Sequence, residues 1–323
     1  MITLPYLNAL AESLPGATLD LLTREEAVSV PRATRIFGRV FALGGGRSER
    51  WQLVQSPPLL LRLMARGYDA VLDLQNNRVS RLFRRVLRPP AWSAFDRVSP
   101  ISAGERTRRT IAAAGFALPV VRPGFALADP EAGWSLLREA GWHPGEPLVV
   151  LNPAGAFSSR HWPMESYVAF ARLWQARHGG RFLALGLASI APRVHALEEG
   201  LGAQLINLVG RTDSGQALSL VRQARLVLSE DSGLMHMAWV SGVPTLALFG
   251  SSRADWSAPQ GNHSRCLHSG DLPCGACLDA VCRYGDVHCL TRYSAEQVVE
   301  AGEALLAGLD GVPKTIAAPA VIA

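Results

Sequence analysis

Polar residues that could do chemistry cluster after a strand predicted over 224–229. Four of them follow it closely: Asp231, Ser232, Gly233 and His236. An Asp or Ser in this place caps a helix, and the free backbone N–H groups at the start of that helix can bind an anion. The same residues also suit an ordinary capped helix with a half-buried histidine. This element alone therefore leaves a structural and a ligand-binding interpretation open.

A second polar loop follows the strand predicted over 147–152. It begins at Asn152, passes through Arg160 and reaches Trp162, and Pro163 then opens a helix. The planar guanidinium group of Arg160 suits a diphosphate, whereas a tryptophan here favours packing over stacking on a base. Ligands of open parallel sheets bind beyond the carboxyl ends of the strands. Both loops are therefore expected to form one cradle for a phosphate or diphosphate.

Signals in the first half of the chain are weaker. Asp73, Gln75 and Arg78 follow a predicted strand and could face an acceptor, although capping explains them equally well. Five arginines between 78 and 88 have helical spacing, which is typical of a solvated face and also suits an anionic lipid surface or a phosphorylated acceptor. The glycines at 44–46 lack the GxGxxG spacing, which disfavours a nicotinamide-dependent dehydrogenase.

Four of the five cysteines lie close together in the sequence. They are Cys274, Cys277, Cys282 and Cys289. This spacing allows a zinc or iron site, yet zinc motifs usually contain two CxxC pairs. Free or oxidised thiols are the other interpretation.

Short apolar runs alternate with longer helical patterns along the chain, which predicts an α/β fold with parallel sheets. Strands are expected at 18–22, 39–43, 69–74, 147–152, 181–186, 203–208, 224–229 and 244–250, and helices in the first half at 56–66, 78–87 and 102–115. A Pro- and Gly-rich stretch over 119–133 predicts a linker. We expect two domains, 1–128 and 129–311, followed by a disordered tail at 312–323.

Composition excludes several classes of protein. The 323 residues are 48% hydrophobic and 18% charged, which argues against a disordered or fibrous chain. No apolar run approaches the ~20 residues of a membrane span, and the N-terminus lacks the features of a signal peptide, so we expect a cytoplasmic protein. The net charge is +5 and all basic residues except Lys314 are arginine, which does not indicate nucleic-acid binding.

These segments together resemble the bacterial glycosyltransferases that include the ADP-heptose:lipopolysaccharide heptosyltransferases. The resemblance rests on TLPYLNAL, YDAVLDLQ, NPAGA, RHWP, LVGRT, EDSGLMH, GVPTLALFG and the cysteine cluster. It implies the GT-B architecture, in which two Rossmann-like domains face each other and the C-terminal one binds the sugar nucleotide.

The resemblance also implies a reaction: transfer of heptose, or a similar sugar, from an ADP-sugar to a lipopolysaccharide core-type acceptor at the inner-membrane surface, with inversion and without a required metal or other cofactor. It implies that Asp231, Ser232, Gly233 and His236 bind the donor diphosphate, together with Arg160. Two alternatives are a nucleotide-sugar epimerase, for which no carboxylate and histidine set is recognisable in the first domain, and a non-catalytic sugar-nucleotide-binding protein.

The general base is the remaining expectation. In the family, an apolar strand and a Gly-Asp turn precede the TLP segment, and that Asp is taken as the base. Met1 stands about two residues before TLP here, so the resemblance implies a base upstream of Met1. A misassigned start is the favoured explanation, and a natural variant that lacks the base is the alternative. The polypeptide as printed is then expected to be poorly stable and nearly inactive.

Overall fold

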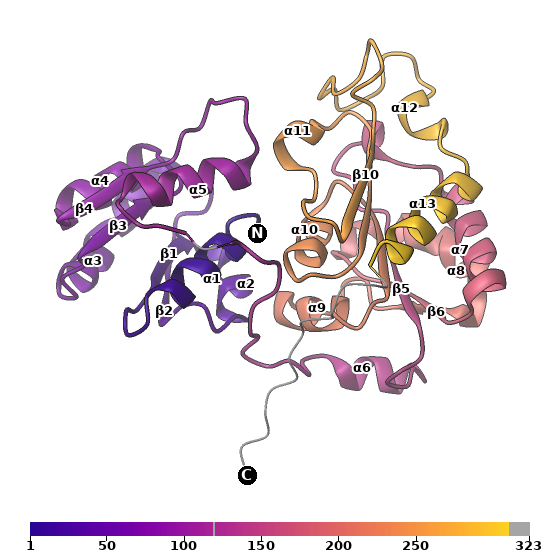
Figure 1. Cartoon of the computed structure of the whole chain (residues 1–323), viewed down its shortest axis with the longest axis horizontal. Helices are drawn as coiled ribbons and strands as arrows, with labels where there is room; N and C mark the ends of the chain where they lie inside the picture. Colours follow the sequence, from indigo (N-terminus) through magenta and orange to yellow (C-terminus); the bar gives the residue numbers. More distant parts are fainter. Residues whose placement is uncertain (119, 310–323) are drawn as a thin grey trace. The chain divides into compact units, whose positions relative to one another are not determined.

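The computed structural model describes residues 1–118 and 120–309 (Figure 1). The chain divides into two compact units. The first is Met1–Pro130 with Asp255–Ser257, and the second is Glu131–Ala254 with the described residues from Ala258 onward. The predicted boundary at 128/129 lies beside this division, and the predicted tail at 312–323 lies outside the described residues.

A six-stranded parallel sheet forms the centre of the second unit, in the order β10-β9-β8-β5-β6-β7. Its strands are β5 (Leu148–Asn152), β6 (Arg181–Ala184), β7 (Leu205–Asn207), β8 (Leu226–Glu230), β9 (Thr245–Phe249) and β10 (Ser264–His268). Every residue of β5, β8 and β9 is buried. This explains why five strands could be predicted as near-continuous apolar runs, whereas the polar edge strand β10 was missed.

Helices cover both faces of this sheet. They are α6 (Trp134–Glu139), α7 (Met164–His178), α8 (Ala191–Leu201), α9 (Ser214–Val221), α10 (Gly233–Val240), α12 (His288–Thr291) and α13 (Ala295–Ala307). Val149 and Leu151 of β5 pack in a core with α7, α8 and α13, and Leu148 and Val150 pack in a second core with α6, α9 and α10. The unit is therefore doubly wound, as predicted.

The first unit contains two parallel strand pairs, β1 with β2 and β3 with β4. Its elements are α1 (Leu4–Ser13), β1 (Asp20–Arg24), α2 (Ser29–Arg32), β2 (Arg39–Leu43), α3 (Glu49–Met64), β3 (Ala70–Asp73), α4 (Arg78–Leu87), β4 (Ala91–Ala94) and α5 (Ala103–Ala113). Predicted helix α4 is confirmed, and α5 has Ser102 as its N-cap, as predicted. The short strand β4 was not predicted.

The helix predicted over 56–66 begins earlier than expected. It starts at Glu49, and the Ser48 side chain caps it by accepting a hydrogen bond from the Trp51 N–H. Pro57 and Pro58 therefore lie in the helix interior instead of its first turn. Both prolines are exposed, so the carbonyl groups that lose an N–H partner there can be solvated. Across the described residues, no helix is long and apolar enough to span a bilayer.

Candidate functional site

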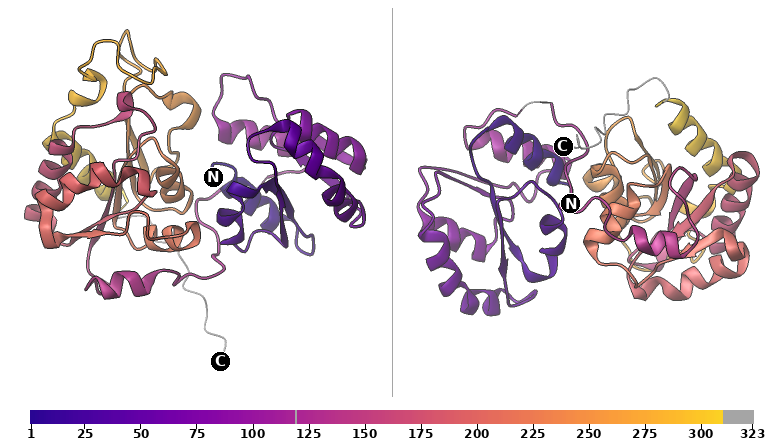
Figure 2. Two further views of the ribbon diagram at one scale, coloured as in Figure 1. Left: turned by 180° about the vertical axis from the view of Figure 1, so that it is seen from behind. Right: turned by 90° about the horizontal axis from the view of Figure 1, so that it is seen from below.

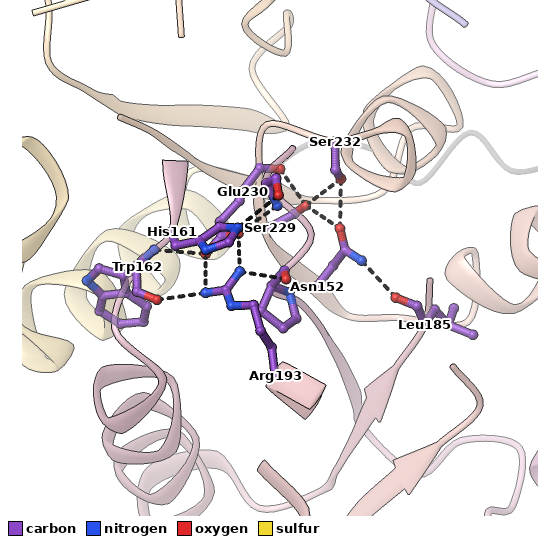
Figure 3. A network of polar contacts seen from close by, with 10 residues as sticks. Asn152, His161, Trp162, Leu185, Arg193, Ser229, Glu230 and Ser232 are labelled. Carbon is purple, nitrogen blue, oxygen red and sulfur yellow. Dashed lines mark hydrogen bonds and ion pairs between the residues drawn. The ribbon is translucent and has the colours of Figure 1, made fainter. Parts of the chain in front are cut away.

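A buried ion pair lies at the carboxyl end of β8 (Figure 3). Glu230 is completely buried, and its two oxygens accept hydrogen bonds from Arg193 Nη1 at 2.7 Å and Nη2 at 2.9 Å. The same oxygens accept from the backbone N–H groups of Gly155, at 2.7 Å, and Trp162, at 2.8 Å. Four donors therefore compensate the carboxylate, which a buried charge requires.

Arg193 also fixes the loop that follows β5. Its guanidinium donates to the carbonyl of Pro153 at 2.7 Å and to that of Trp162 at 2.9 Å. The ion pair therefore holds both ends of the loop that carries Arg160. Sequence reasoning assigned no role to Arg193 or Glu230. The available signal was an acidic residue at the end of an apolar strand, because such a carboxylate needs a cationic partner.

Asn152 ties three strand ends together, as Figure 3 shows. It is completely buried, and its amide nitrogen donates to the Leu185 carbonyl at 2.7 Å. Its carbonyl oxygen accepts from the hydroxyl groups of Ser229, at 2.9 Å, and Ser232, at 2.7 Å. Asn152 therefore positions Ser232 at the entrance to α10.

Ser232 is the N-cap of α10, because its hydroxyl oxygen accepts a hydrogen bond from the Met235 N–H at 3.2 Å. The sequence left Asp231 or Ser232 as the cap, and the structure decides for Ser232. Gly233 is exposed, and a Cβ added to it would meet no protein atom within 4 Å. The Met235 N–H is taken by this cap and the His236 N–H by the Ser232 carbonyl. The N–H groups of Gly233 and Leu234 have no partner among the described residues and are available to an anion.

Arg160 is anchored beside this helix by Asp231. Its Nη1 lies 2.9 Å from Asp231 Oδ2, and the Ser252 hydroxyl donates to the same oxygen at 2.6 Å. The two charged side chains are only 16% and 15% exposed, so water screens their attraction less than on an open surface. The geometry gives Asp231 a partner within the protein and holds the Arg160 fork in one orientation.

His236 lies one turn into α10 and is half-buried. Its Nδ1 accepts a hydrogen bond from the Trp239 indole N–H at 3.0 Å, so the neutral ring carries its proton on Nε2. Burial lowers the pKa of His236 to about 4, against the opposing effect of the Asp231 charge. At neutral pH the ring is therefore an uncharged hydrogen-bond donor.

Cys274, Cys277 and Cys282 lie in the loop between β10 and α12, and Cys289 lies in α12 itself. Burial raises the pKa of Cys289 to about 11, and the neighbouring Cys282, Cys274 and Cys277 add to this, so Cys289 is within electrostatic reach of the other three thiols. Cys274 Sγ also lies 3.2 Å from His288 Nε2. In the described part of the chain, no three histidine, cysteine or acidic side chains are arranged to hold a metal ion.

The residues predicted on the acceptor side lie in the first unit. Asp73 ends β3 and is buried, and its Oδ1 accepts from the backbone N–H groups of Asn76, at 2.7 Å, and Gln75, at 3.3 Å. Its other carboxylate oxygen is buried without a partner in the described residues. Gln75 and Arg78 are exposed. Asp73 thus acts at least as a turn cap, which was one of its two interpretations.

Comparison with known proteins decides the family. Residues 59–288 match the sequence model of glycosyltransferase family 9 (heptosyltransferase). The chain belongs to this family. This family 9 glycosyltransferase is 27% identical over 343 aligned residues to lipopolysaccharide heptosyltransferase 1 of Pseudomonas aeruginosa, covering 94% of each chain. It is 25% identical over 189 residues to lipopolysaccharide heptosyltransferase 2 of Escherichia coli, covering 57% of this chain and 53% of that protein.

Solved structures share the fold. A family 9 glycosyltransferase from Veillonella parvula superposes with a TM-score of 0.79 at 19% identity, covering 95% of this chain and 93% of the other. The E. coli ADP-heptose lipopolysaccharide heptosyltransferase II gives 0.72 at 19% identity, covering 95% and 94%. The predicted α/β GT-B fold is therefore confirmed, and the family match identifies the protein as a glycosyltransferase.

Proposed function

We propose that this glycosyltransferase moves heptose, or a similar sugar, from an ADP-sugar donor to a lipopolysaccharide core-type acceptor. The observation that carries the proposal is the anchored Arg160 beside the open N-terminus of α10. A diphosphate fits such a place, because helix N–H groups and a guanidinium both attract it. The heptosyltransferase names of the curated relatives support heptose as the sugar.

The donor half of the reaction follows from these groups. As the bond between the sugar and the diphosphate breaks, negative charge grows on the leaving phosphate oxygens. The α10 N–H groups and Arg160 stabilise that charge, so the transfer needs no metal ion. A base removes the proton of the acceptor hydroxyl, which attacks from the opposite face and inverts the anomeric carbon.

Other residues hold this machinery in place. Ser252 and Asp231 orient Arg160, and the Glu230–Arg193 pair fixes its loop. Asp231 therefore acts through Arg160, since a carboxylate placed directly on a diphosphate would repel it. The Nε2–H group of His236 donates to an oxygen of the donor.

The acceptor is assigned to the first unit, on the side of Asp73, Gln75 and Arg78. A lipopolysaccharide core-type acceptor is a glycolipid, so the enzyme works as a peripheral protein on the cytoplasmic face of the inner membrane. The competing proposal is a protein of the same fold that binds the sugar nucleotide without transferring it.

Calorimetric titration with ADP tests the donor site. Arg160→Gln should weaken ADP binding about tenfold to a hundredfold, because hydrogen bonds to charged groups contribute ~1.5–3 kcal/mol. The matched control is Arg138→Gln, which removes an exposed arginine on α6. Unchanged ADP affinity in the Arg160 variant would refute the assignment. Normal ADP binding without turnover would favour the non-catalytic alternative.

A further inference from the structure

The first unit exposes a long apolar stripe on α3. Trp51, Val54, Leu61 and Met64 are 62%, 65%, 69% and 50% exposed. Residues three or four positions apart share one face of a helix, so these side chains form one ridge toward solvent. The opposite face of α3 is the buried one, at Gln52, Ser56, Leu59 and Leu63. An apolar ridge exposed on the outer side of a helix is typical of a surface that meets another apolar surface.

Helix α4 presents a stripe of positive charge. Arg78, Arg81 and Arg85 follow one another at spacings of three and four residues, Arg88 is the C-cap residue directly after the helix, and all four are exposed. Val79 and Phe83 lie on the buried side. The helix contains no acidic residue, and none of the four arginines forms an ion pair with another described residue. Their charge is therefore available to a partner.

The two stripes lie on one surface. Figure 2 shows α3 and α4 side by side, and both pack on one core that includes Leu59 and Leu63 of α3 and Val79 and Phe83 of α4. Their exposed sides therefore both point away from this core. We call these exposed sides together the α3–α4 face, made of Trp51, Val54, Leu61 and Met64 with Arg78, Arg81, Arg85 and Arg88. Beside it, the Arg84 guanidinium lies 4.0 Å from the ring centroid of the half-exposed Trp92.

We propose that the α3–α4 face binds the surface of an anionic phospholipid bilayer. Apolar side chains enter the boundary between headgroups and acyl chains, while arginines beside them attract lipid phosphates. Charge complementarity selects this occupant, because a second copy of the chain would bring another set of unpaired arginines to the same surface. The inference uses only two helices of the first unit and does not depend on the donor site. It gives the enzyme a means of reaching a membrane-held acceptor of the proposed function.

Vesicle cosedimentation with the full chain tests the proposal. The vesicles contain phosphatidylcholine alone, or phosphatidylcholine mixed with phosphatidylglycerol, and no donor or acceptor. We expect binding to the mixed vesicles that weakens as salt is raised. Arg85→Glu should lower the partition coefficient at least about fivefold, since one basic residue near an anionic surface contributes ~1 kcal/mol and 1.4 kcal/mol is tenfold. Val54→Ser should lower it severalfold through lost apolar insertion.

Matched controls make the same changes on exposed residues of the second unit. Arg138→Glu and Val281→Ser should leave vesicle binding unchanged. The proposal is overturned if the mixed vesicles do not bind the protein, if both face variants bind like their controls, or if neutral vesicles bind equally well. A dimer in sedimentation equilibrium that Val54→Ser dissociates would instead assign the face to a second copy. ADP affinity, measured in parallel, should be unchanged by the face variants, so failure of this proposal is separate from failure of the donor site.

Discussion

Replacing Glu230 with glutamine is the most informative single change in the second unit. The side chain keeps its shape, but one carboxylate oxygen becomes an NH₂ group. In the wild type, each carboxylate oxygen accepts one hydrogen bond from Arg193 and one from a backbone N–H, of Gly155 or of Trp162. Whichever way the glutamine amide is turned, its NH₂ group, a donor, faces one N–H of Arg193 and one backbone N–H, which are also donors. Arg193 in addition loses its counter-ion.

The expected cost follows from burial. Glu230 is completely buried and Arg193 is 19% exposed, so water compensates little of the loss. Breaking a buried pair by removing one partner costs ~3–5 kcal/mol. For a domain of this size class, 1 kcal/mol moves the melting temperature by ~2–4 °C, so we expect a decrease of about 6–20 °C.

Thermal unfolding followed by tryptophan fluorescence measures the effect. Glu199→Gln, the same change on an exposed residue of α8, is the control and should shift the melting temperature by less than about 2 °C. Arg193→Met combined with Glu230→Gln should cost less than the sum of the single changes, because the pair is lost only once. A Glu230→Gln variant that melts with the wild type would refute the reasoning about this ion pair.

Further predictions concern the donor site and the thiols. Asp231→Ala should weaken ADP binding by ~1–3 kcal/mol in calorimetry, because it releases Arg160; equal affinity would contradict this. The folded-state pKa of His236, about 4, lies below its ordinary 6.5, so the stability it contributes is present above pH 6.5 and is lost toward pH 4, at up to ~1.4 kcal/mol per pH unit. In His236→Gln, the urea midpoint of unfolding should vary less with pH over that window than in the wild type. A pH profile identical to that of the wild type would contradict a buried, neutral His236 ring. Transfer should persist in excess EDTA, and loss of turnover that Mg²⁺ restores would contradict a metal-independent mechanism. Burial raises the pKa of Cys266 to about 12, so iodoacetamide should label it much more slowly in the folded than in the unfolded protein at pH 8, and equal labelling rates in mass mapping would contradict this raised pKa.

Much of the second unit could be predicted from the sequence, because its strands are buried on both faces. Runs such as Leu226–Glu230 contain the pattern of a central parallel strand in themselves. Strands β4 and β10 were missed because their short, partly polar runs are defined by pairing with a neighbour. The predicted start of helix α3 was too late, because Pro57 and Pro58 were expected in the first turn of the helix. The Ser48 cap in fact lies well before them.

The site was predictable in its residue types more than in its contacts. Hydroxyl and charged residues at strand ends indicated an anion cradle, and Ser232 does cap α10. The partners were not visible, because pairs such as Glu230 with Arg193 join residues far apart in the sequence. The spacing of the four cysteines likewise predicted that they lie near one another, but it could not define whether their thiols are arranged to bind a metal ion.

Turnover with a defined donor and acceptor tests the central claim most directly. The purified chain is incubated with ADP-heptose and a deacylated lipopolysaccharide core acceptor, and products are identified by mass spectrometry and by the configuration of the new bond. We predict one added heptose with inverted anomeric configuration and release of one ADP for each heptose transferred, with strongly reduced turnover in Arg160→Gln. Such turnover would also overturn the expectation, stated from the sequence, that the polypeptide as printed is nearly inactive. ADP binding without any glycosylated product from this acceptor would contradict the account.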